Sequence, residues 1–155
     1  MSSNVNVTNP SKRKRVLIVA ANPATSPTTG WPIGFWWAEL THPWWAFTEA
    51  GRVTALVCHA TCVLLEARLA TGALLVEGKT WTGFANSEEQ LADSFVGTRI
   101  QPFWIEEEAR QIEGTNFVVD QPFREFAVRD GLLVTGQQQF SGAAAARLVI
   151  EALGR

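Results

Sequence analysis

The sequence predicts a three-layer α/β sandwich with a parallel-rich central sheet and a small C-terminal β-hairpin. Two apolar runs, 15–21 and 53–57, flank a helical pattern over 38–50. An apolar strand, a helix and a second apolar strand form a βαβ unit, whose parallel strands are buried on both faces. The dipeptide Asp130-Gly131 between two strand-like segments is typical of a hairpin turn.

The remaining elements follow from periodicity and turn residues. Segment 22–34 is rich in Pro, Thr, Ser and Gly and indicates a loop. Asn86 precedes Glu88 and Glu89, and a cap residue followed by acids suits the start of a helix. Segment 141–153 is rich in Ala and predicts a closing helix. We also expect helices over 61–70 and 102–112 and strands over 79–84, 116–120, 124–128 and 132–135.

Length and composition indicate one globular domain. The chain has 155 residues, of which 46% are hydrophobic and 18% charged. A net charge of −2 argues against nucleic-acid and membrane partners, and no apolar run is long enough to span a bilayer. The basic residues 12–15 are interpreted as a solvated lead-in to the first strand. We expect a flexible tail over 1–14, a single domain over 15–155, and a cytoplasmic location with free thiols.

Tryptophan is unevenly distributed. The chain has seven Trp and no Tyr, and five of the Trp lie within segment 31–45. Such a cluster either fills a corner of the core or a dimer contact, or forms an exposed patch for another partner. We favour packing in the core or in a dimer.

The segment around Cys58 has the pattern of a nucleophile turn. A β-branched apolar run ends at Cys58-His59, and a helical pattern begins at once. The thiol would lie at the amino end of a helix, where partial positive charge and free N–H groups favour a thiolate. The local pattern fits equally a buried structural Cys beside a solvated His. Cys62 is interpreted as a core residue, and the set falls short of the four ligands usual for a structural metal.

Several segments, in order along the chain, resemble one family. They begin with the strand at 16–19, a G-x-x-x-E-x-x-x-P helix and the Cys58 turn, and continue through L-V-E-G-K, T-G-F-A-N-S-E-E and D-G-L-L-V-T-G-Q. Together they resemble the ThiJ/PfpI superfamily, with its class I glutamine-amidotransferase-like, flavodoxin-like fold. The chain is most similar to the branch of glutathione-independent glyoxalase III enzymes and heat-shock chaperones.

The resemblance implies roles for four residues. Cys58 matches the nucleophile, and Glu39 matches the carboxylic acid that hydrogen-bonds the thiol and shuttles protons. His59 matches the histidine after the cysteine, and Glu89, with Glu88 as its rival, matches the acid that orients this histidine. The thiolate would add to a methylglyoxal-like 2-oxoaldehyde, and D-lactate would be released. The resemblance implies a small carbonyl substrate, a homodimer, and no metal or organic cofactor.

The sequence also departs from the family. The helix ending at Gly51 runs directly into 52–57, where family members have roughly two further strand–helix units, about 60 residues at ~30 per unit. A Gly-rich turn that supplies N–H donors to the substrate oxygen has no match, and losing one such donor costs about 10²–10³-fold in rate. Three alternatives to a glyoxalase therefore stay open. These are a holdase using segment 31–45, amidase, protease or hydratase chemistry at Cys58, and an inactive truncated relative.

Overall fold

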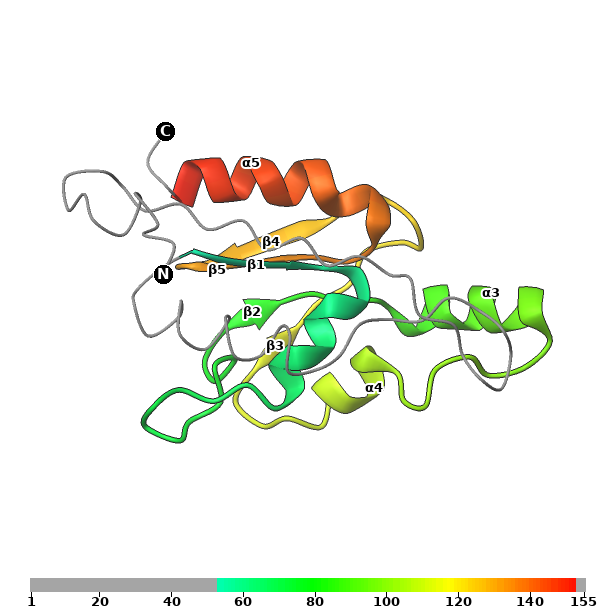
Figure 1. Cartoon of the computed structure of the whole chain (residues 1–155), viewed down its shortest axis with the longest axis horizontal. Coiled ribbons are helices and arrows are strands. Elements are labelled where there is room, and N and C mark those ends of the chain that lie inside the picture. Colours follow the sequence, from blue (N-terminus) through cyan, green and yellow to red (C-terminus); the bar gives the residue numbers. More distant parts are fainter. Residues whose placement is uncertain (1–52, 153–155) are drawn as a thin grey trace, which may run out of the picture.

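The computed structural model describes residues 53–152 (Figure 1). The predicted tail 1–14, the strand 15–21, the Trp-rich segment 31–45 and the helix 38–50 lie outside the described residues. The described elements, in chain order, are β1 (Thr54–Val57), η1 (Cys58–Leu65), β2 (Thr80–Trp81), α3 (Asn86–Val96), α4 (Ile105–Ala109), β3 (Asn116–Phe117), β4 (Ala127–Asp130), β5 (Leu133–Gly136), η2 (Gln139–Ser141) and α5 (Gly142–Ala152).

The sheet that carries the site has the strand order β1-β5-β4. β1 and β5 are parallel, with Val57 opposite Gly136, and β4 and β5 form the predicted antiparallel hairpin. Gly131 begins the hairpin turn with φ +61°, a left-handed conformation that glycine adopts without a steric penalty. β2 and β3 form a separate parallel pair. The predicted hairpin is therefore confirmed, and the wider sheet is mixed.

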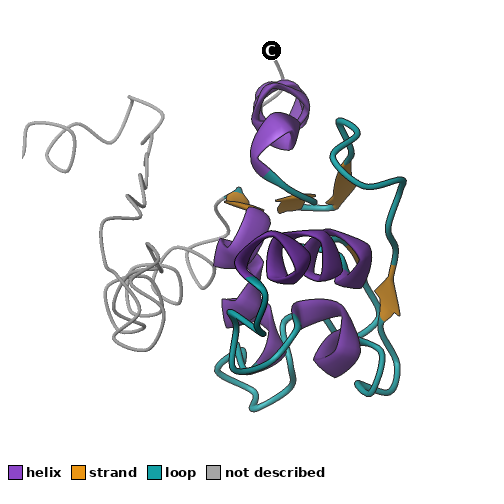
Figure 2. Cartoon of the chain, turned by 90° about the vertical axis from the view of Figure 1, so that its right-hand side faces the viewer, coloured by secondary structure: helices purple, strands orange, loops and turns teal. Residues whose placement is uncertain are grey.

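Helices lie on both sides of this sheet. α5 covers one side, and η1, α4 and the β2–β3 pair lie on the other (Figures 1 and 2). This arrangement confirms the predicted α/β class and is consistent with a flavodoxin-like fold. The core lies between the sheet and η1, and its largest fully buried apolar side chains are Trp81, Leu64, Ile105, Val63 and Val76.

The helix predicted over 61–70 is wrong in its bounds and its type. A 3₁₀ helix begins at Cys58 and ends at Leu65. The Thr61 hydroxyl donates to the Cys58 carbonyl at 2.7 Å, and such side-chain bonds compete with regular helical pairing. After Leu65 the chain reverses, and Arg68 bridges Leu74 in antiparallel fashion.

Several other predicted elements are shorter or displaced. The strand predicted over 79–84 is only Thr80–Trp81, and the next amide, Thr82 N–H, donates to the Thr135 hydroxyl at 2.9 Å. Its partner β3 is equally short, and α4 occupies only the middle of 102–112. The strand predicted over 124–128 begins three residues later, after a turn closed by Arg124 N–H and the Gln121 carbonyl. The closing helix agrees with its prediction within one residue at each end.

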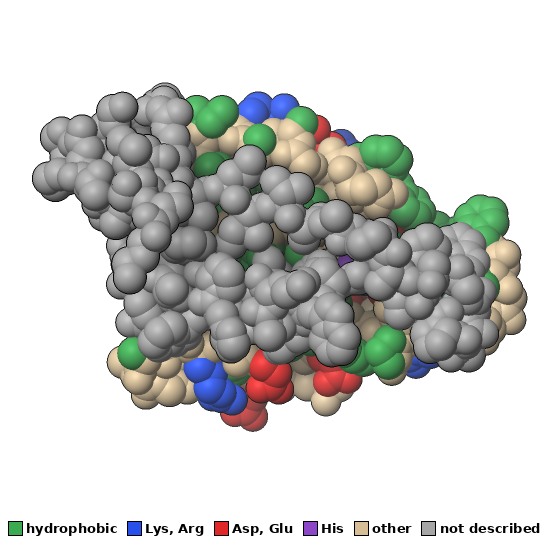
Figure 3. Space-filling view, viewed as in Figure 1, with side chains coloured by type: hydrophobic (Ala, Val, Ile, Leu, Met, Phe, Trp, Pro, Cys, Tyr) green, Lys and Arg blue, Asp and Glu red, His purple; other side chains and the backbone are tan. Residues whose placement is uncertain are grey.

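Charges on the described surface are mixed. Both acidic and basic side chains appear along the upper and lower edges of the face in Figure 3. Within residues 53–152, none of the helices combines the length and the apolar character that crossing a bilayer requires.

Candidate active site

An unusual backbone conformation follows directly after β1. Cys58 has φ +62°, which is unusual for a residue with a side chain. Such conformations cost about 1–3 kcal/mol and gather at functional sites, where the surrounding structure enforces them. The hydrogen bond from Thr61 to the Cys58 carbonyl holds the turn from the helix side. The predicted tight strand-to-helix turn is therefore present, although the helix after it is 3₁₀.

A chain of polar contacts leads from the Cys58 sulfur into the protein. Cys58 Sγ lies 3.4 Å from His59 Nδ1, and His59 Nε2 lies 3.0 Å from Glu89 Oε1. The Glu89 side chain is only 2% exposed, whereas the His59 side chain is 41% exposed. The thiol thus adjoins an imidazole whose far nitrogen is held by a buried carboxylate.

The surroundings of His59 raise its affinity for a proton. Burial of the ring lowers its pKa, but hydrogen bonds to Cys58 and Glu89 and their negative charges outweigh burial and raise the pKa of His59 from 6.5 to about 9. At neutral pH the ring is therefore an imidazolium, and both nitrogens donate, one to sulfur and one to Glu89. The protonated ring thus lies 3.4 Å from the Cys58 sulfur and can deliver a proton beside it.

The histidine ring is also fixed by packing. It stacks on Phe84, with ring centroids 4.1 Å apart and planes 26° apart. The segment bearing Phe84 approaches the turn closely because the preceding residue is Gly83. A Cβ at Gly83 would lie 2.3 Å from Thr61 Oγ1, well inside van der Waals contact. Glycine at this position therefore lets the loop before α3 pack against the turn.

Glu89 reaches His59 from the first turn of α3. The predicted cap residue Asn86 is instead the first helical residue, and Ala85 takes the cap position. This shift occurs because Glu88 reaches back to accept from Ala85 N–H at 3.0 Å. The two rival acids thus have different partners, and Glu89 is the one that contacts His59.

Cys62, one turn further along η1, is in a different environment. It packs against the hydrophobic core, and burial raises the pKa of its thiol to about 11. It is therefore a thiol that stays protonated at neutral pH, as expected for a core cysteine.

The structure leaves part of the predicted site undescribed. Glu39, the expected proton shuttle, lies outside residues 53–152. The sequence patterns assign no functional role to Phe84, Gly83 or Thr61. An aromatic and a glycine directly before a predicted helix start were the available signals.

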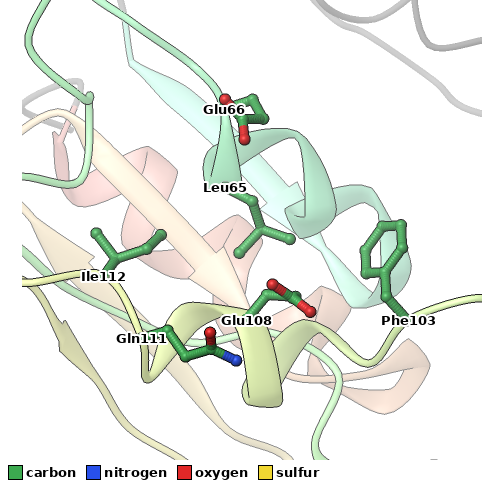
Figure 4. Close-up of a pocket in the computed structure, with 6 residues that line it drawn as sticks. All are labelled: Leu65, Glu66, Phe103, Glu108, Gln111 and Ile112. Carbon is green, nitrogen blue, oxygen red and sulfur yellow. The ribbon is translucent and has the colours of Figure 1, made fainter.

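One pocket in the described part lies away from Cys58. It has a volume of about 560 Å³ and lies between the end of η1 and α4. Leu65 and Glu108 project into the space between these helices (Figure 4), and Glu66, Phe103, Gln111 and Ile112 complete the lining. Because none of these residues belongs to the Cys58–His59–Glu89 chain, this pocket is not the space in front of the thiol.

The chain is similar to known proteins in sequence and in structure. No family model matches the sequence. A probable glutathione-independent glyoxalase of Schizosaccharomyces pombe is 36% identical over 104 residues, which are 66% of this chain and 47% of the relative. A crystallographic structure of a protein without a functional name matches with a TM-score of 0.64 and 37% identity, over 74% of this chain and 50% of that chain.

A second solved structure is also similar to the chain. The crystal structure of glyoxalase III from Candida albicans matches with a TM-score of 0.54 and 28% identity, over 68% of this chain and 45% of that chain. These similarities are consistent with the predicted ThiJ/PfpI superfamily. The chain spans about half the length of the relatives it matches.

Proposed function

We propose that this chain carries the thiol centre of a glyoxalase III-type enzyme, which converts 2-oxoaldehydes to 2-hydroxy acids without glutathione. The observation that carries the proposal is the chain of contacts from Cys58 Sγ through His59 to Glu89, built on a left-handed Cys58. The names of the two glyoxalase relatives support it. The relatives are about twice as long, so the activity of the whole protein is part of the proposal.

The chemistry begins with addition to the aldehyde. The Cys58 thiolate attacks the aldehyde carbon, a C–S bond forms, and the carbonyl electron pair moves to oxygen. The new alkoxide takes the proton from His59 Nδ1, which lies beside the sulfur. Glu89 keeps the ring oriented and compensates its charge while it is protonated. The product of this step is a neutral hemithioacetal.

The later steps move a hydrogen and release the acid. A base removes the proton from the former aldehyde carbon, and a proton is delivered to the neighbouring ketone carbon, which yields a thioester of the 2-hydroxy acid. The resemblance assigns this transfer to Glu39. Water then attacks the thioester carbonyl, the C–S bond breaks, and the thiolate is restored. With methylglyoxal as substrate the balance is one water consumed and one lactate formed, which we propose to be the D-isomer.

The test is turnover of methylglyoxal in the absence of glutathione. Lactate is measured enzymatically with D- and L-specific dehydrogenases. We expect D-lactate from the native chain, none from Cys58→Ala, and an unchanged rate from Cys62→Ala, the matched thiol control. Absence of D-lactate although Cys58 alkylates rapidly would refute the glyoxalase assignment and direct the search to amide or hydratase substrates. Suppression of client aggregation that survives Cys58→Ala would favour the holdase alternative.

A further inference from the structure

Glu88 has a buried carboxylate that the proposed reaction does not use. It lies next to Glu89 in the first turn of α3 and is 0% exposed. Consecutive helical residues point about 100° apart, so the two acids serve different neighbours. A buried carboxylate needs several hydrogen-bond donors to offset its desolvation. The positions of these donors show which segments of the chain the carboxylate connects.

The donors to Glu88 come from three separate parts of the chain. Oε2 accepts from Ala85 N–H at 3.0 Å, at the start of α3. Oε1 accepts from Phe123 N–H at 2.8 Å, in the loop between β3 and β4, and from Gln137 Nε2 at 3.0 Å, just after β5. The Glu88 side chain therefore connects the start of α3 with the β3–β4 loop and with the segment after β5. β5 is the strand that pairs with β1, which leads into Cys58.

The β3–β4 loop, which Glu88 contacts at Phe123, contains an unfavourable backbone conformation. Phe123 has φ +58°, the second left-handed residue with a side chain in the described part. Gln137 supports the same loop, because its Oε1 accepts from Asp120 N–H at 2.7 Å. Such a conformation persists only where neighbouring contacts enforce it.

We propose that Glu88 is a positioning residue for the thiol site: it fixes the first turn of α3 so that Glu89 meets His59 and His59 meets Cys58. The connection is direct, since Glu89 follows Glu88 in the chain and makes the contact to His59 Nε2. A carboxylate offers two acceptor oxygens, whereas an amide offers one oxygen and an NH₂ group. Gln at position 88 would place that NH₂ against an N–H donor, and the turn would shift. The kinetic part of the inference rests on the proposed function, and the geometric part does not.

The experiment compares Glu88→Gln with Thr115→Val in the full chain. Thr115→Val is the matched control because it removes the acceptor of the buried Trp81 indole N–H, 2.9 Å away, in the β2–β3 region. The readouts are the melting temperature, the rate of Cys58 alkylation by iodoacetamide near pH 6, and NMR titration of the His59 ring. We expect both variants to melt earlier, and only Glu88→Gln to slow alkylation by about tenfold and to move the His59 titration to lower pH.

Two outcomes would overturn the inference. If Glu88→Gln melts earlier yet keeps Cys58 alkylation within twofold of the native rate, Glu88 serves stability alone. If Glu88→Gln does not fold, Gln137→Met removes only one of the three donors, and unchanged alkylation in that variant would equally refute the positioning role. With methylglyoxal we expect a lower kcat and a similar KM for Glu88→Gln. A native chain without turnover would refute the proposed function, while the alkylation and titration results would still decide the role of Glu88.

Discussion

Replacing Glu89 by Gln tests how the charge on His59 is maintained. The variant keeps the size of the side chain and replaces a buried carboxylate, 3.0 Å from His59 Nε2, with a neutral amide. A hydrogen bond to a charged group contributes about 1.5–3 kcal/mol. At about 1.4 kcal/mol per pKa unit, its loss lowers a pKa by roughly one to two units. We therefore expect the pKa of His59 to fall from about 9 to between about 7 and 8.

The assay is an NMR titration of the histidine ring C–H signals. The chain has two His, and a His42→Gln variant assigns the remaining signal to His59. Glu151→Gln, on exposed α5, is the matched control, and it should leave the titration unchanged. A Glu89→Gln variant whose His59 titrates within ~0.3 units of the native protein, below the one unit set by a single charged hydrogen bond, would show that Glu89 does not maintain the charge on His59.

Three further predictions concern stability. Gly83→Ala should lower the free energy of unfolding by about 1–3 kcal/mol, because its Cβ would overlap Thr61 Oγ1; denaturant unfolding that matches the native protein would contradict this. The free energy of unfolding of Cys58→Gly should exceed that of Cys58→Ala by about 1 kcal/mol, because only glycine is unstrained at φ +62°. Denaturant unfolding in the reverse order would show that the turn is not strained. The raised pKa of His59 stabilises the fold fully below about pH 6.5, and this contribution is lost as pH rises through about 9; a melting-temperature profile in which His59→Gln parallels the native protein from pH 6 to 10 would argue against it.

Segments with one dominant local signal were predicted well from the sequence. The apolar run before Cys58 formed β1, Asp130-Gly131 formed the hairpin, and the Ala-rich end formed α5. In each case a pattern within a few residues of the element decides the structure, because strand burial, turn conformation and helix propensity act locally.

Predictions failed where a distant side chain sets the structure. The strand predicted over 79–84 ends after Trp81, and the next amide, Thr82 N–H, bonds the Thr135 hydroxyl, 53 positions away. The sequence also left Glu88 and Glu89 undecided, because both suit a helix start and only their distant partners distinguish them. The stack of His59 on Phe84 likewise depends on the close approach at Gly83, which no local periodicity encodes.

We propose that residues 53–152 assemble an activated thiol at Cys58. Iodoacetamide alkylation of the native chain from pH 5 to 9, with each cysteine followed by mass spectrometry, measures this activation. Cys62 is the internal control, because burial raises the pKa of its thiol to about 11. We predict rapid alkylation of Cys58 at pH 6, where Cys62 stays unmodified, and loss of this difference in His59→Gln. Equal, slow reaction of both thiols that begins only above pH 8 would show that Cys58 is not activated.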